Sequence, residues 1–196
     1  LSFSQRVNDA QFFKALALIQ LNDVSGALMA LGAVGPSTNY PRALQEAAAI
    51  LVSRGDIGAA NAFFEEHRKV HTDGAELNFA VHAETLQTLG SIEAESVLSR
   101  GISAFPTSTR LLFARANFRE RAGFFDLAEA DYRQILNLNP GDANALNALG
   151  YALTNNTDRF QEAAGLLEEA ISKDPRNPAI IDSLGWVYFK LGKDRQ

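Results

Sequence analysis

The chain has 196 residues, of which 46% are apolar and 21% charged, an ordinary composition for a globular protein. The absence of cysteine excludes disulfides, thiolate zinc sites and thiol nucleophiles within this sequence, and the net charge of −5 argues against general affinity for nucleic acid. No stretch approaches the roughly 20 apolar residues of a membrane span. No secretory signal is visible at the start, and because the sequence opens at Leu1 rather than Met, we expect a piece of a longer protein.

Apolar residues that recur every three or four positions predict a succession of short helices. Turn-forming and capping residues, such as the run from Asn155 to Asp158, separate them. We expect essentially no β-strand. In chain order, the helices are expected near residues 8–21, 24–34, 41–54, 57–70, 75–89, 91–104, 109–122, 125–137, 143–155, 160–172 and 178–191.

A period of 34 or 35 residues runs through these helices, and such a period is typical of repeat proteins. It appears in the prolines Pro106, Pro140 and Pro175 and in the alanines Ala60, Ala94, Ala128 and Ala163. Four residues after each alanine comes a large side chain, namely Phe64, Leu98, Tyr132 or Leu167. About twelve residues before each alanine lies a small or compact residue, namely Ala48, His82, Ala116 or Gly150. Small residues at fixed positions allow two helices to approach closely.

The unit at 143–177 resembles a tetratricopeptide-repeat (TPR) motif with one extra residue in its turn, because it carries Leu149-Gly150, Ala163 and Pro175 in order. The resemblance implies an all-α solenoid of antiparallel helix pairs that forms one superhelical domain over 1–196. About five and a half repeats are expected, at 8–40, 41–74, 75–108, 109–142, 143–177 and, as a half repeat, 178–196. The sequence departs from the motif at Arg119, where tyrosine is preferred, and at Asn78, where tryptophan is preferred.

A finer resemblance covers residues 142–193, which are similar to the carboxy-terminal repeats of TPR lipoproteins from Gram-negative bacteria. It rests on the pieces "LNALGY" and "DSLGW" and on a turn of Thr, Asp and an aromatic residue. The resemblance implies a bacterial adaptor of a periplasmic carboxy-terminal processing protease, tethered to the outer membrane by a lipid upstream of Leu1. The alternative location is the cytoplasm.

The TPR resemblance also implies a binding groove, because the first helix of each repeat lines the concave face in that family. Arg121 is the expected charged anchor, and Tyr151 and Trp186 are expected to supply most of the apolar binding energy. Alternatively, these two aromatics only seal neighbouring repeats. A clamp for a terminal carboxylate is absent, since Ala148 and Ala179 stand at its positions. When the family's groove positions are carried over residue by residue, they predict one continuous row on the concave face. Its members are Phe79, Phe113, Asn117, Arg121, Asn147, Tyr151, Asp182 and Trp186.

The histidines and the paired glutamates are the other residues that could bind a metal or transfer protons. His67 and His71 lie four residues apart and could share a metal. A solvated helix end is the favoured interpretation, because a metal site needs two more ligands and the intervening Arg68 and Lys69 are cations, which are unfavourable beside a divalent metal. His82 is expected to pack between helices rather than act as a base. The adjacent pairs Glu65-Glu66 and Glu168-Glu169 do not share a helix face. We therefore expect no catalytic residue, no metal and no cofactor.

Two functions follow from this interpretation. The first is a non-catalytic scaffold or adaptor that binds a protein or peptide, and the alternative is a regulatory or targeting domain of a larger enzyme. The last helix carries an apolar stripe of Leu184, Tyr188 and Leu191, which a following helix would normally cover. We expect either that the chain was cut within a repeat or that a second copy covers the stripe in a weak homo-oligomer.

Overall fold

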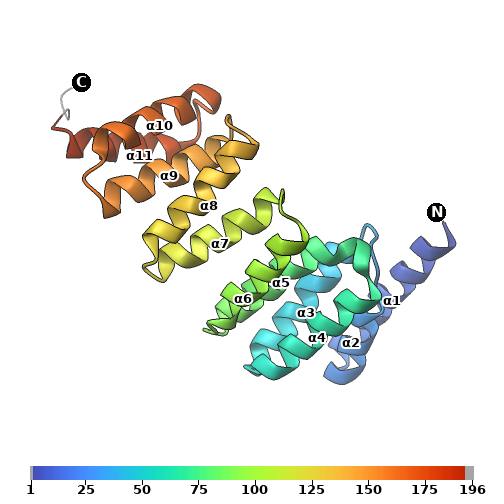
Figure 1. Cartoon of the computed structure of the whole chain (residues 1–196). Coiled ribbons are helices and arrows are strands. Elements are labelled where there is room, and N and C mark those ends of the chain that lie inside the picture. Colours follow the sequence, from blue (N-terminus) through green and yellow to red (C-terminus); the bar gives the residue numbers. More distant parts are fainter. Residues whose placement is uncertain (1, 193–196) are drawn as a thin grey trace. The chain divides into compact units, whose positions relative to one another are not determined.

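The computed structural model describes residues 2–192, which contain α-helices, one short 3-10 helix and no β-strand. No helix among them is long and apolar enough to cross a bilayer. The helices are α1 (Phe3–Gln20), α2 (Val24–Gly32), α3 (Tyr40–Arg54), α4 (Ile57–Val70), η1 (Thr72–Gly74), α5 (Ala75–Thr88), α6 (Glu93–Ala104), α7 (Thr109–Arg121), α8 (Phe125–Leu138), α9 (Ala143–Asn156), α10 (Phe160–Lys173) and α11 (Pro178–Lys190) (Figure 1).

The chain divides into two compact units, Leu1–Pro106 and Thr107–Gln196. In the first unit, α1 to α6 pack successively, and α3 also contacts α5. In the second unit, α7 to α11 pack in the same way, and α11 contacts both α9 and α10 (Figure 1). Each unit is therefore a stack of antiparallel helix pairs, as the periodic sequence predicts.

Local signals explain where most helices begin and end. The side chains of Asp56, Ser108 and Asp142 each accept a hydrogen bond from a backbone N–H in the first turn of the following helix. At the carboxyl ends of α3 and α7, Gly55 and Gly123 adopt positive φ, which only glycine adopts without strain. These signals are short-range, so a sequence can reveal them.

Ten of the predicted helices agree with the structure to within two residues at each end. The first was wrong, because α1 begins at Phe3 rather than near residue 8. The hydroxyl oxygen of Ser2 accepts a hydrogen bond from the backbone N–H of Gln5 at 3.1 Å and so caps the helix earlier than its apolar pattern suggests.

The predicted ladder of small and large residues forms the core of both units. The alanines of the ladder are at most 1% exposed, and the four large residues that follow them are fully buried. Among the compact positions, a Cβ on Gly150 would lie 2.7 Å from Cγ of Leu167 and 3.1 Å from the carbonyl oxygen of Ala163. The periodicity therefore reflects the close approach of paired helices.

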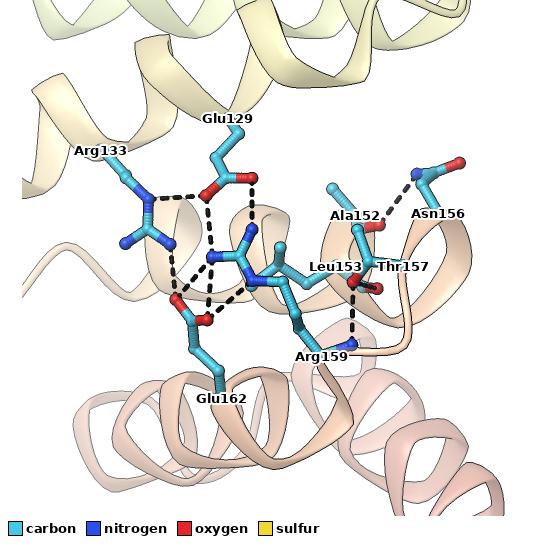
Figure 2. Close-up of polar contacts among 8 residues, drawn as sticks. All are labelled: Glu129, Arg133, Ala152, Leu153, Asn156, Thr157, Arg159 and Glu162. Atoms are coloured by element: carbon cyan, nitrogen blue, oxygen red, sulfur yellow. Dashed lines mark hydrogen bonds and ion pairs between the residues drawn. The ribbon is translucent and has the colours of Figure 1, made fainter.

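A buried ion-pair group joins α7 to α8 within the second unit. The Asp131 carboxylate, which is 2% exposed, accepts hydrogen bonds from Nε and Nη2 of Arg115 and from Nη1 of Arg119, at 2.7 to 3.0 Å. Arg119 stands where the motif prefers tyrosine, and it forms an ion pair with Asp131. A second, exposed group links Glu129 and Arg133 of α8 to Arg159 and Glu162 (Figure 2).

The turn between α9 and α10 is the one with the extra residue. It has no left-handed residue; instead, the Thr157 hydroxyl donates to the Leu153 carbonyl at 2.7 Å and accepts from the Arg159 N–H at 3.1 Å. The Asn156 amide donates to the Ala152 carbonyl at 2.8 Å (Figure 2). These side-chain hydrogen bonds reinforce the end of α9, where the Leu153 carbonyl also accepts the Thr157 N–H at 3.1 Å.

Candidate functional site

A cavity of about 590 Å³ lies within the second unit, on α7, α8, α9 and α11. A ligand pocket typically has this size, with an apolar lining and a few polar groups that fix orientation. We call this cavity the unit 2 pocket. Its lining residues are Asn117, Glu120, Tyr132, Asn147, Ala148, Tyr151, Ala179, Asp182, Ser183 and Trp186.

Five of the eight predicted groove residues line this pocket, namely Asn117, Asn147, Tyr151, Asp182 and Trp186. Phe113 lies in the same unit outside the lining, with its ring edge-on to Tyr132 at 5.6 Å between centroids. Arg121, the predicted anchor, is exposed at the end of α7 and is also outside the lining. Phe79 belongs to the first unit, where its ring lies 4.3 Å below the Arg68 guanidinium. The single row through all eight residues therefore stays a prediction.

Tyr132 connects the helix core to the polar wall of the pocket. Its ring is fully buried, while its hydroxyl lies 2.8 Å from Oδ1 of Asn117 and 2.9 Å from Oε2 of Glu120 and donates to these acceptors. Burial, and then the negative charge of Glu120, raises the pKa of Tyr132 far above its ordinary value. The hydroxyl therefore stays a donor and fixes both side chains. The sequence pattern predicted Tyr132 only as a core residue. Phe or Leu stands at the equivalent position in the other repeats, so the hydroxyl of Tyr132 was the signal that could have predicted a polar role.

The two aromatic side chains at the pocket rim are accessible. Tyr151 is 47% exposed and Trp186 is 38% exposed. The Trp186 indole N–H donates to Oδ1 of Asn155 at 2.9 Å, and its ring stacks on Phe189 with centroids 5.6 Å apart. Trp186 is therefore held in place while part of its surface remains free for a partner.

The polar lining consists of amides, hydroxyls and carboxylates, of which only the carboxylates are acceptors alone. Oδ1 of Asn147 is buried and has no hydrogen-bond partner within residues 2–192. The Ser183 hydroxyl donates to the Ala179 carbonyl at 2.8 Å, which leaves its oxygen lone pairs. The charged members of the lining are the carboxylates of Glu120 and Asp182.

The first unit has smaller cavities, one of about 230 Å³ between α3 and α5 and one of about 350 Å³ between α2 and α4. The second is lined by Phe63 and His67, but neither lining includes a predicted groove residue. Since the unit 2 pocket is larger and carries two exposed aromatic side chains, of the kind that dominate binding energy at protein interfaces, it is the stronger candidate site.

The prediction of a solvated helix end at His67 and His71 was wrong. His67 is 3% exposed, and its Nε2 lies 3.2 Å from the Val34 carbonyl, while Nδ1 lies 3.2 Å from the amide nitrogen of Asn78. His71 is partly buried, with Nε2 at 3.2 Å from the Gly32 carbonyl. Both rings thus turn inward onto α2 and the loop after it. Within the described residues, no group of three or more His, Cys, Asp or Glu side chains could hold a metal ion.

His82 packs between helices, as expected. Its ring stacks on Phe64 with centroids 4.9 Å apart. An Arg68 guanidinium donates to Nδ1 at 3.1 Å, so Nε2 carries the proton and donates to Oδ1 of Asn61 at 2.8 Å. The same Arg68 nitrogen donates to Asn78 at 2.6 Å. The two buried histidines are therefore neutral members of one polar network.

Comparisons with known proteins agree with this architecture. No family model matches the chain. A TPR repeat-containing protein of Pseudomonas aeruginosa is 30% identical over 188 residues, which cover 95% of this chain and 32% of that protein. The chain therefore spans about a third of the length of this relative.

Solved structures are similar in fold. One is YrrB, described as a TPR protein with an unusual peptide-binding site, with a TM-score of 0.58, 19% identity, and coverage of 88% of this chain and 89% of that one. Another is the first TPR of Spaghetti (RPAP3), bound to an HSP90 peptide, with a TM-score of 0.56, 23% identity, and coverage of 60% and 93%. The fold of the chain is therefore that of a TPR solenoid.

Proposed function

We propose that the chain is a non-catalytic scaffold that binds a peptide or an extended segment of a protein, and that the unit 2 pocket is its main contact site. The observation that carries the proposal is the exposure of Tyr151 and Trp186 on a pocket that is otherwise lined by amides, small side chains, carboxylates and the buried Tyr132. The peptide-binding descriptions of YrrB and of the Spaghetti TPR support a function of this kind.

The residue types fit a peptide ligand. Asn117 and Asn147 carry amides that can pair with a peptide backbone. Tyr151 and Trp186 supply broad, rigid apolar surfaces of the kind found at binding hot spots, where truncation costs about 2 kcal/mol or more. The part of the predicted row that lies in the second unit, including Phe113 and Arg121, is proposed to extend the contact beyond the pocket.

The test uses a display library of random twelve-residue peptides, selected on the purified chain. The affinity of the enriched peptides is then measured for the wild type and for Tyr151→Ala and Trp186→Ala. We expect affinity to fall at least about tenfold, or roughly 1.4 kcal/mol, while the melting temperature moves little. Phe124→Ala is the matched control, because Phe124 is a 58% exposed aromatic of the same unit outside the pocket.

The opposite pattern would assign these aromatics to packing. If Tyr151→Ala and Trp186→Ala lower the melting temperature sharply while the folded variants bind normally, the aromatics only seal neighbouring helices. If the library yields no enriched peptide, the peptide-binding function itself fails.

The more specific role that we propose is an adaptor that presents substrates to a periplasmic carboxy-terminal processing protease. Its support is the resemblance of residues 142–193 to the TPR lipoproteins described above. Since the chain spans about a third of its Pseudomonas relative, the full-length protein is required for the test. Addition of that protein should increase the cleavage rate of the protease from the same organism, and an unchanged rate would remove the adaptor role.

We also propose weak self-association through α11. Ile181 and Phe189 of this helix are 49% and 57% exposed, whereas the predicted stripe of Leu184, Tyr188 and Leu191 is partly buried. Sedimentation equilibrium should show a dimer at high concentration that Phe189→Ser weakens. A monomer over the whole concentration range would contradict this interface.

A further inference from the structure

The charges that line the unit 2 pocket have one sign. Glu120 projects from α7 and Asp182 from α11, and no Lys, Arg or His side chain belongs to the lining. The basic residues Arg121 and Lys190 lie outside it, and Nζ of Lys190 lies 4.8 Å over the Trp186 ring. A pocket lined in this way attracts a cation and repels a carboxylate.

No ion pair among residues 2–192 neutralises either carboxylate. Glu120 accepts the Tyr132 hydroxyl through Oε2, which leaves Oε1 for a ligand. Asp182 is exposed, and within the same residues no hydrogen bond or ion pair holds its carboxylate. Both groups are therefore available to a donor that enters the pocket.

The charged acceptors of the lining favour a ligand group that donates. The carboxylates of Glu120 and Asp182 have free acceptor oxygens, whereas the Tyr132 and Ser183 hydroxyl hydrogens are already used inside the protein. The amides of Asn117 and Asn147 can both donate and accept, which suits the backbone on either side of such a group. Lysine and arginine are the side chains that donate hydrogen bonds without accepting any. Their aliphatic stems also suit apolar surfaces such as those of Tyr151 and Trp186.

An exposed ring of the rim adds a second attraction for a cation. The Trp186 ring already holds the Lys190 ammonium at 4.8 Å and stacks on Phe189, so the protein itself uses this indole. Tyr151 is 47% exposed and is the other exposed ring of the lining. A basic side chain beside Tyr151 would therefore gain from both the carboxylates and an aromatic face.

We infer that the unit 2 pocket binds the lysine or arginine side chain of an extended peptide, with its cationic end between Glu120 and Asp182. This inference rests on the proposed function and names the partner as a segment centred on a basic residue. It differs from recognition of a terminal carboxylate, because Ala148 and Ala179 in the lining offer no positive charge to such a group.

The test starts from the twelve-residue library and continues with defined peptides, acetylated and amidated so that their ends carry no charge. An enriched peptide is compared with two versions in which its central arginine or lysine is replaced by a neutral residue of similar length or by glutamate. We expect enrichment of basic residues, at least tenfold weaker binding of the neutral version, and no measurable binding of the glutamate version. The preference should decrease at high salt.

The protein variants Glu120→Gln and Asp182→Asn each remove one negative charge from the lining and keep the shape of the side chain. The double variant should lose at least tenfold in affinity for the basic peptide and should bind the neutral peptide as the wild type does. Glu169→Gln is the control for each single variant, because it also removes one negative charge, on an exposed residue of α10 in the same unit. Thermal melting of each variant verifies that it is folded.

The two proposals fail in different ways. Enriched peptides with neutral or acidic centres that still depend on Tyr151 and Trp186 would overturn the cationic ligand and leave the peptide-binding function intact. A double variant that binds the basic peptide like the wild type would do the same. A library without enriched peptides would overturn both proposals.

Discussion

The Cβ atom that Gly150 lacks would lie 2.7 Å from Cγ of Leu167, a distance closer than a carbon–carbon contact allows. We predict that Gly150→Ala destabilises the chain by about 1 kcal/mol or more, because overpacking of a core costs roughly 1–3 kcal/mol and exceeds the gain in helix propensity. Urea unfolding monitored by circular dichroism measures the change.

The control for this prediction is Gly165→Ala in α10. A Cβ at Gly165 meets nothing within 4 Å, so only the helix propensity of alanine acts, and stability should rise by up to about 1 kcal/mol. Equal changes in the two variants would show that α9 and α10 are not in close contact at Gly150.

Acid should destabilise the first unit through its buried histidines. Burial, and then the nearby charge of His71, lowers the pKa of His67 to about 4, and burial, followed by Arg68 and Arg100, lowers that of His82 to about 3. Because both values lie below the unfolded value of 6.5, the unfolded state takes up these protons first as the pH falls. Stability should therefore decline from about pH 6.5 down to about pH 4 for His67 and pH 3 for His82.

At pH 4.5 each histidine should contribute a loss of about 3 kcal/mol, since this pH lies two units below the unfolded pKa of 6.5 and each unit corresponds to about 1.4 kcal/mol. Urea unfolding between pH 7.5 and 4.5 measures this slope. His82→Gln keeps a donor and an acceptor but cannot titrate, so the variant should show a clearly shallower slope. The same slope in both proteins would mean that His82 does not contribute to the acid sensitivity.

The buried and the exposed ionic groups of the second unit should contribute differently to the free energy of unfolding. Asp131→Asn leaves the Arg115 and Arg119 guanidiniums without their buried carboxylate, and we expect a loss of about 3 kcal/mol. Glu162→Gln affects an exposed group that water and salt screen, so its unfolding midpoint should stay close to that of the wild type (Figure 2). Comparable losses in both variants would contradict the assignment of Asp131 as the buried member.

The hydroxyl of Thr157 should stabilise the turn between α9 and α10. Thr157→Val keeps the shape but removes one donated and one accepted hydrogen bond, so we expect a loss of about 1 kcal/mol. Thr107→Val, at an exposed threonine that starts the second unit, should change little. Chemical denaturation of the two variants side by side makes the comparison.

The sequence revealed most of the fold because its signals are local. Capping residues such as Asp142, glycines such as Gly55 and the 34-residue period act within a few positions or repeat regularly. The burial of His67 was missed because it depends on Val34, 33 residues earlier, and on Asn78 in the next helix. No periodic pattern encodes such contacts.

The site was predictable only in part for the same reason. The family positions identified five residues that line the unit 2 pocket, yet Tyr132 was assigned to the core alone, since its hydroxyl contacts depend on how α8 meets α7. The charge of the pocket also escaped the sequence analysis. Arg121 and Lys190 are neighbours of the lining in sequence, and the structure leaves them outside it.

The turn after α9 has a consequence for how repeats of this kind vary in length. Thirteen residues separate Gly150 from Ala163, against twelve between Ala116 and Ala128. The added residue is accommodated by the side chains of Asn156 and Thr157, and α10 still brings Ala163 and Leu167 against Gly150. A length change is thus absorbed where it occurs, and the helices that follow keep their pairing. The period of such a sequence is set separately by each turn and need not be constant along the chain.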